Sequence, residues 1–220
     1  TDPEAVRHFA TEVLQEVGPP DVLLNIAGIS IWGPIDRLQE EHWRRLIDVN
    51  LMGPVHVMSS FLPAMIEAGR GGHVVNVSSA AGIFGLPWHA AYSASKFGLR
   101  GVSEVLRFDL RRHGIGVSLV CPGAVATPLV RDLEVVGVDR SAPSVRAIEH
   151  RFLRRAISPE VAAAAIVTGL ERRRYWVYTS RDVRIGHYAQ RWFPWAYSLV
   201  MRYLNRMLTR AEARATTGAT

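Results

Sequence analysis

Apolar residues recur at helical spacing over the first seventeen positions, which predicts an amphipathic helix from Thr1 to about Val17. Asp2 before Pro3 provides a capping side chain and a proline for the first turn. Gly18-Pro19-Pro20 then ends the helix. The apolar stripe consists of Val6, Phe9, Ala10, Val13 and Val17.

Short apolar runs without polar alternation follow at intervals, and they predict the strands of a buried parallel sheet. The first run, 21–28, ends in glycine and leads into a loop rich in glycine and proline. The next runs are 73–78 and 117–121, and Pro122-Gly123 ends the second of them. The segment 175–178 is a further strand candidate.

Helical periodicity fills the segments between these runs. We predict helices over 40–68 and 91–113, and an irregular, partly helical segment over 128–155. Ser158-Pro159-Glu160 carries the cap, the first-turn proline and the early acid that begin a helix, which we expect to reach about Arg172. Strand and helix alternate, so the predicted class is α/β, with a doubly wound, Rossmann-like parallel sheet.

Composition then narrows the possible functions. The 220 residues are 48% hydrophobic, enough to bury a substantial core. The net charge of +6 would suit nucleic acid, but the arginines are scattered and no zinc-finger or RNA-binding signature occurs. We therefore expect no nucleic-acid partner and no metal. The lone cysteine, Cys121, excludes an internal disulfide and is expected to be a buried structural thiol in a cytoplasmic protein. No run of about 18 apolar residues occurs, so we expect no membrane span.

The chain has a single lysine against 25 arginines, and that lysine follows a tyrosine by four positions. On a helix, Tyr92 and Lys96 would lie on one face. An ammonium beside a phenol favours its ionisation, so we expect a lowered pKa for Tyr92, as in a general acid or base. The alternative for this pair alone is a solvated lysine beside a half-buried tyrosine.

The surrounding motifs favour the functional interpretation. In chain order they are Asn25-Ile26-Ala27-Gly28 at the end of the first strand, Asp48-Val49-Asn50 within the long helix, Ser78-Ser79 after the second strand, Tyr92-Ser93-Ala94-Ser95-Lys96, and Pro122-Gly123-Ala124-Val125-Ala126-Thr127 after the third strand. Each is weak alone, but this ordered set resembles the short-chain dehydrogenase/reductase family. The resemblance implies an oxidoreductase that transfers a hydride between NAD or NADP and an alcohol or ketone.

The resemblance also implies the catalytic roles. Tyr92 would give or take the hydroxyl proton, and Ser79 would position the substrate oxygen, since its spacing from the tyrosine favours it over Ser78. Lys96 would tune the tyrosine and bind the nicotinamide ribose. Asn50 would hold a water in the proton relay; the alternative for Asn50 is a helix-interior residue that only kinks the helix.

Residues at the strand ends would hold the cofactor. Gly28 lets backbone approach it without a Cβ, Asn25 would brace the neighbouring strand, and Thr127 would donate a hydroxyl to the nicotinamide carboxamide. Ile26 replaces an asparagine common in the family, a mild change on a buried strand. The full cofactor-binding set is Asn25, Ala27, Gly28, Tyr92, Lys96, Pro122, Gly123, Val125 and Thr127.

The glycine-rich phosphate loop of such folds is missing from the sequence. The glycine cluster 69–72 precedes a strand, whereas a pyrophosphate loop follows one. About two βα units would have to precede Thr1, and with them the residue that separates NAD from NADP. Either the residues are part of a longer chain, or this is a non-catalytic scaffold of the same fold.

The expected substrate contacts are Ser79, Phe84, Trp88 and Tyr92, within an apolar rim that predicts a hydrophobic alcohol or ketone such as a lipid or steroid. The alternative is that the rim packs against 128–155. The family would form homodimers or homotetramers through 40–68 and 91–113. The rim residues are Ile83, Phe84, Leu86, Trp88, Leu129 and Val130.

We divide the chain into a family domain over 1–180 and an extension over 181–220. The extension places Trp192-Phe193-Pro194-Trp195 before an amphipathic helix with arginines on one face. Such a helix either covers the substrate pocket, seals a subunit contact, or makes the protein peripheral to a membrane through 187–210. The sequence leaves these alternatives open.

Overall fold

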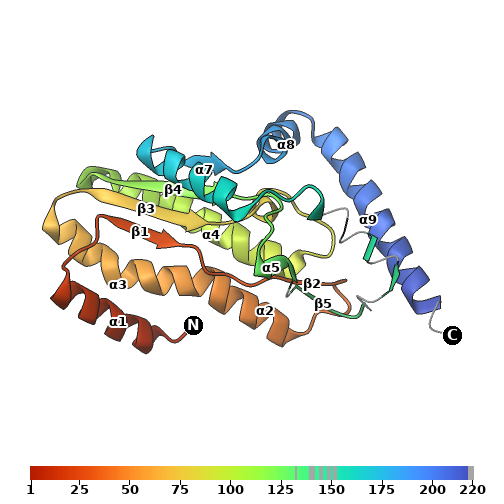
Figure 1. The fold of residues 1–220 in the computed structure, drawn as a ribbon, viewed down its shortest axis with the longest axis horizontal. Coiled ribbons are helices and arrows are strands. Elements are labelled where there is room, and N and C mark those ends of the chain that lie inside the picture. Colours follow the sequence, from red (N-terminus) through yellow and green to blue (C-terminus); the bar gives the residue numbers. More distant parts are fainter. Residues whose placement is uncertain (132, 139–141, 144–145, 148–149, 151–152, 218–220) are drawn as a thin grey trace.

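The computed structural model describes residues 1–131, 133–138, 142–143, 146–147, 150 and 153–217 (Figure 1). Its strands are β1 (Val22–Asn25), β2 (Ile31–Trp32), β3 (Gly72–Val77), β4 (Ile115–Cys121), β5 (Glu134–Val135) and β6 (Trp176–Tyr178). Its α-helices are α1 (Pro3–Glu16), α2 (Glu40–Ile47), α3 (Gly53–Ala68), α4 (Ala90–Asp109), α5 (Pro128–Arg131), α7 (Pro159–Glu171), α8 (Arg181–Trp192) and α9 (Pro194–Thr217).

The predicted parallel sheet is confirmed. Its strand order is β1-β3-β4-β6, and every neighbouring pair is parallel. A separate pair, β2 with β5, was not predicted, because each strand has only two residues and no periodicity marks it. The parallel order brings the carboxyl ends of all four main strands to one edge, where ligands bind in open α/β sheets.

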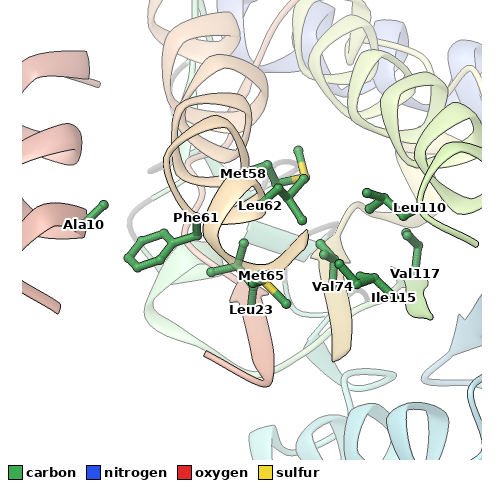
Figure 2. Packing of buried hydrophobic residues seen from close by; sticks show 10 residues of the cluster. All are labelled: Ala10, Leu23, Met58, Phe61, Leu62, Met65, Val74, Leu110, Ile115 and Val117. Carbon is green, nitrogen blue, oxygen red and sulfur yellow. The ribbon is translucent and has the colours of Figure 1, made fainter. Parts of the chain in front are cut away.

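The helices cover the sheet in two layers (Figure 1). On one face, Val74 of β3 belongs to a core cluster with residues of α1, α3 and β1 (Figure 2). On the other face, the next residue, Val75, packs with Val120 and Val177 against Ile166 of α7. Successive side chains of a strand point to opposite faces, so an apolar run such as β3 serves both layers.

The first strand differs from the prediction of a buried strand. β1 pairs with β3 on one side only, and its burial alternates: Leu23 and Asn25 are buried, whereas Leu24 is 44% exposed. Ile26, beyond the strand, is 56% exposed. The expectation that Ile26 lies on a buried strand is therefore wrong. The apolar run of β1 does not reveal that one face and one edge of this strand are uncovered by the described residues.

The predicted helix over 40–68 is continuous but not uniform. A π-helical turn, Asp48–Met52, separates α2 from α3, and such turns occur often at functional sites. The 29 residues have a mean hydropathy of 1.3 in their most apolar window, and length and composition alone would suit a membrane crossing. However, Met58, Phe61 and Met65 pack into the core beside the sheet, as in a core helix (Figure 2).

The ends of two helices confirm their predicted signals. The Asp2 side chain accepts a hydrogen bond from the Glu4 backbone N–H at 2.8 Å, before Pro3. The Ser158 hydroxyl accepts one from Val161 N–H at 3.4 Å. The C-terminal extension forms α8 and α9, which contact each other and run along one end of the molecule (Figure 1).

Candidate active site

Ser79 and Tyr92 meet at the carboxyl edge of the sheet. Ser79 follows β3 and caps a 3₁₀ turn, accepting a hydrogen bond from Ala81 N–H at 3.1 Å. Tyr92 lies in the first turn of α4, is only 7% exposed, and shares a side-chain hydrogen bond with Ser79. The Pro122 carbonyl accepts from Ala80 N–H at 2.7 Å, which brings the loop after β4 beside them.

The acidity of Tyr92 differs from the sequence prediction. Burial raises the pKa of Tyr92, and the hydrogen bond from Ser79 offsets only part of this rise. The Lys96 Nζ lies 5.9 Å from the centre of the tyrosine ring. The predicted lowering of this pKa is therefore wrong for this structure, because desolvation of the phenolate outweighs the hydrogen bond from Ser79. At neutral pH, Tyr92 is a phenol and a proton donor.

Lys96 is buried among the strand ends. Its Nζ donates a hydrogen bond to the Val77 carbonyl at 3.0 Å, and burial lowers the pKa of Lys96 to about 8. A Cβ on Gly28 would lie 3.3 Å from this Nζ and 3.0 Å from Asn50 Oδ1. Gly28 thus keeps a gap next to the ammonium, which still has two N–H donors for a ligand.

Asn50 is fully buried in the π-helical turn and ties two segments together. Its Oδ1 accepts from Ile29 N–H at 2.9 Å, and its Nδ2 donates to the Ile29 carbonyl at 3.0 Å and to Ser95 Oγ at 3.1 Å. Ser95 in turn donates to the Tyr92 carbonyl at 2.7 Å. Asn50 therefore fixes the segment after Gly28 against the first turn of α4. The predicted water-holding role stays a prediction.

The structure also separates the two serines. Ser78 is buried, and its hydroxyl donates to the Lys96 carbonyl at 3.0 Å, so it anchors α4 to the strand end. Ser79 is the one whose side chain reaches Tyr92. This arrangement agrees with the choice of Ser79 made from its spacing.

A buried polar chain braces β1 against its neighbours, as predicted for Asn25. Asn25 Nδ2 donates to Asn76 Oδ1 at 2.8 Å, and Asn76 Nδ2 donates to Ser103 Oγ at 2.9 Å. Ser103 in turn donates to the Leu99 carbonyl at 2.7 Å. Sequence reasoning missed Asn76 and Ser103; an asparagine inside the apolar run of β3 was the available signal.

The loop after β4, which carries the predicted cofactor residues, packs against the segment before α7. Val125 forms a bridge with Ile157, which holds the loop against the segment before α7. Thr127 is half-buried, whereas Ala27, on the β1 side, is exposed. The hydroxyls of Thr179 and Ser180, after β6, are buried and have no hydrogen-bond partner among the described residues. These two hydroxyls were not predicted.

A cavity of about 530 Å³ lies beside the start of α4. Trp88, a residue with a left-handed backbone (φ 66°), contributes to its wall, and its predicted substrate contact stays a prediction. The cavity wall also includes residues of α9, so the C-terminal extension borders the cavity. The cavity is lined by Gly33, Pro34, Ile35, Asp36, Gly85, Leu86, Trp88, Ala90, Ser93, Asn205, Thr209 and Glu212.

Other members of the predicted rim lie elsewhere. Ile83 is 1% exposed in a core cluster with Leu119 and is not open to a substrate. Phe84 packs toward α8 and α9: its ring would contact a Cβ on Gly186. Leu129 is 38% exposed, and the Val130 side chain lies outside the described part of the chain.

His89 was missed by sequence reasoning. It is buried beside Tyr92, with 6.1 Å between ring centres, and its ring lies 4.1 Å from that of Trp32. Its Nδ1 is 2.7 Å from the Pro87 carbonyl, and burial lowers the pKa of His89 to about 4. His89 is therefore neutral near pH 7 and acts as packing beside Tyr92.

Comparisons with known proteins agree with this geometry. The chain is 35% identical over 169 residues to the putative oxidoreductase SadH of Mycobacterium tuberculosis, which covers 76% of this chain and 60% of SadH. A short-chain dehydrogenase from Streptomyces avermitilis has a similar structure, with a TM-score of 0.76 and 28% identity, over 93% of this chain and 76% of that one.

Two further solved structures carry cofactors. A short chain dehydrogenase/reductase from Burkholderia phymatum in complex with NAD matches with a TM-score of 0.76 and 25% identity, over 86% of this chain and 72% of that one. A metagenomic short-chain oxidoreductase in complex with NADP is 44% identical, with a TM-score of 0.52, over 56% of each chain.

The family match covers most of the residues of the candidate active site. The chain spans about three fifths of the length of SadH, so the activity of the whole protein does not follow from this likeness alone. The family profile described as short chain dehydrogenase matches residues 1–135, which include Ser79, Tyr92 and Lys96. The chain belongs to the short-chain dehydrogenase/reductase family.

Proposed function

We propose that this protein is an NAD- or NADP-dependent oxidoreductase that interconverts a hydrophobic alcohol and its ketone. The observation that carries the proposal is the buried Tyr92, hydrogen-bonded to Ser79 and one helical turn before the buried ammonium of Lys96. Burying a charge is costly unless it is paired and hydrogen-bonded, and one carbonyl partner leaves Lys96 with two N–H donors for a ligand.

The residues present fit the nicotinamide end of the cofactor. Gly28 keeps open the gap in front of Lys96 and Asn50, because a Cβ at this position would lie only 3.0 Å from Asn50 Oδ1. Lys96 would bind the nicotinamide ribose, and Thr127 would bind the carboxamide. No glycine-rich turn from a strand into a helix occurs among the described residues, so they offer nothing for the pyrophosphate. Homologues bind either NAD or NADP, and the choice between them stays open.

The proposed reduction moves one hydride and one proton. A reduced nicotinamide, when bound there, would supply the hydride for the carbonyl carbon. Tyr92 donates its hydroxyl proton to the carbonyl oxygen, which becomes the alcohol, and the phenolate left behind is stabilised by Lys96 and Ser79. Ser79 also orients the carbonyl oxygen. The reverse reaction takes the proton from the alcohol back to the phenolate.

The raised pKa of Tyr92 keeps it a phenol near neutral pH, which is the protonation state from which reduction starts. A phenol is already the proton donor that reduction needs, whereas oxidation needs the phenolate. The substrate would enter from the cavity, where Ile35, Leu86 and Trp88 offer apolar surface beside polar residues such as Asp36 and Asn205. We propose an apolar ketone, such as a lipid or steroid, that lies against the apolar part of this wall.

We also propose a homodimer or homotetramer. The solvent-facing side of α4 carries Phe97, Val105 and Phe108, and the last two are 58% and 59% exposed. Aromatic and aliphatic residues spaced along one helix face are typical of a subunit contact. Sedimentation velocity of the wild type and of Phe108→Ser tests this: a monomeric wild type contradicts it.

A turnover assay tests the activity. The protein that carries this chain is incubated with NADH or NADPH and a panel of hydrophobic ketones, with loss of nicotinamide absorbance as the signal. We expect turnover in the wild type and none above background in Tyr92→Phe. Nicotinamide binding without turnover of any ketone would favour the alternative, a non-catalytic scaffold.

A further inference from the structure

Large apolar side chains stand in solvent where α8 meets α9. Trp192 is 70% exposed, Phe193 55% and Trp195 66%. These exposures continue along both helices at helical spacing, through Tyr188 before the corner and Leu199 after it. We call this corner and its flanks the aromatic elbow. It comprises Ile185, Tyr188, Trp192, Phe193, Trp195, Leu199, Val200 and Tyr203. Contiguous exposed apolar surface of this kind marks an interaction site.

The elbow is not exposed because α9 is loose from the body. Tyr197 accepts a hydrogen bond from Gly85 N–H at 2.9 Å, and its ring lies 6.4 Å from that of Phe84. Further along, Ala211 is buried. The inner face of α9 is thus already occupied, and Leu199 and Tyr203 remain exposed on the outer side. The apolar face of α9 that the sequence predicts is therefore wider than the part of it that packs against the rest of the protein.

The charge around the elbow has one sign. The segment 183–211 contains five arginines and no aspartate or glutamate. None of the five forms an ion pair within the described part of the chain. They are Arg184, Arg191, Arg202, Arg206 and Arg210. Aromatic rings with unpaired arginines are the composition of helices that lie in an anionic lipid interface.

We propose that the aromatic elbow docks the protein on the surface of an anionic lipid bilayer. The rings of Trp192, Phe193 and Trp195 would enter the headgroup region, and the arginines would contact lipid phosphates. A second copy of the chain is a poorer occupant. A two-fold contact would place this arginine-rich surface against itself, and like charges across an interface are unfavourable.

An adjoining side of α9 borders the cavity at the start of α4. Asn205 and Thr209 line that cavity, while Arg206 and Arg210, next to them in sequence, are exposed. Because consecutive residues of an α-helix are about 100° apart, the proposed lipid-facing side and the cavity-lining side adjoin on the same helix. This arrangement would give an apolar ketone a short path from the bilayer. That consequence rests on the proposed function, whereas the docking itself does not.

Vesicle co-sedimentation tests the docking without any activity. The purified protein is spun with vesicles of pure phosphatidylcholine and with vesicles of phosphatidylcholine and phosphatidylglycerol in equal parts. We expect sedimentation with the mixed vesicles, reduced by added salt. Trp192→Ser/Trp195→Ser should abolish it. Arg202→Gln/Arg206→Gln/Arg210→Gln should weaken it about 100-fold, since each arginine near an anionic surface contributes about five-fold.

A matched control replaces exposed apolar residues elsewhere. Val161 and Val167 of α7 are 52% and 51% exposed, and Val161→Ser/Val167→Ser should bind vesicles as the wild type does. Circular dichroism verifies that each variant is folded. The proposal is overturned if the wild type stays in the supernatant with both vesicles, or if a folded Trp192→Ser/Trp195→Ser binds normally. It is equally overturned if those two substitutions instead convert a dimer to a monomer in light scattering.

Discussion

The helices α4 and α9 treat polar and apolar side chains in opposite ways. α4 buries Tyr92, Ser95, Lys96 and Ser103, all of which could have been apolar in an ordinary core helix. α9 does the reverse and exposes rings such as Trp195. Both choices cost stability or solubility, so both indicate function.

The cost of burying polar groups on α4 and the cost of exposing rings on α9 are offset in different ways. On α4, the buried hydroxyls of Ser95 and Ser103 have protein partners, and the lysine has the Val77 carbonyl. The polar groups are thereby held in place before any ligand arrives. On α9, the exposed rings have no such partner among the described residues, so another surface would have to cover them. One helix is preorganised for chemistry and the other for contact.

Removal of the Tyr92 hydroxyl is expected to have the largest effect, and it tests whether α4 is the catalytic helix. Tyr92→Phe should lower kcat about 10³-fold or more, as expected for loss of a general acid, and nicotinamide affinity should change little. Steady-state kinetics and a fluorescence titration measure the two quantities. Equal loss of cofactor affinity and turnover would show that Tyr92 is structural.

Ser79→Ala should lower kcat about 10²-fold, because one donor to the reacting oxygen is lost. The matched control is Ser78→Ala. Its hydroxyl serves the Lys96 carbonyl, so it should lower the free energy of unfolding by about 1 kcal/mol and leave kcat nearly unchanged. If the two variants exchange these phenotypes, the assignment of Ser79 fails.

Asn50→Ala should destabilise the fold by about 2–3 kcal/mol, since it leaves Ile29 N–H and the Ile29 carbonyl without their partner. Urea unfolding followed by circular dichroism measures this. A stability within about 0.5 kcal/mol of the wild type would mean that the π-helical turn does not depend on this network.

The pH profile of reduction sharpens the account of α4. Lys96 has a pKa of about 8, so its ammonium is lost as the pH rises through that value. The stabilised phenolate is lost with it, and kcat for reduction should fall above about pH 8. His89 is already neutral, so His89→Gln should leave this inflection in place. An inflection near the ordinary histidine pKa that vanishes in His89→Gln would contradict this assignment.

Tyr197→Phe should have the smallest effect. It removes the hydroxyl that joins α9 to Gly85, at a cost of about 1 kcal/mol, but keeps the ring beside Phe84. We expect hydrogen exchange to accelerate in α9 while the strands stay protected. Unchanged exchange throughout α9 would mean that other contacts hold the helix in place.

Much of this fold follows from local patterns. The main strands, the caps at Asp2 and Ser158, and the pairing of Ser79 with Tyr92 are readable because each depends on residues close in sequence or on the edge shared by parallel strands. The exposed face of β1 is not readable, because a strand's own residues do not say what lies beside it. The same holds for the His89 and Trp32 rings, which meet across 57 positions.

The raised pKa of Tyr92 shows a further limit of sequence reasoning. The spacing to Lys96 predicts an ammonium on the same helix face, but it does not predict that burial raises the pKa of Tyr92. Burial is a property of the whole packed core. The proposed oligomer contact and lipid docking likewise depend on a second surface, that of another subunit or of a bilayer.

The most direct test is turnover with a nicotinamide cofactor in the wild type and in Tyr92→Phe, side by side. NADH and NADPH are titrated by fluorescence into both proteins, and ketone reduction is then followed with the cofactor that binds. We predict that both proteins bind the same cofactor and that only the wild type turns over. Full activity in Tyr92→Phe would contradict the account of this site.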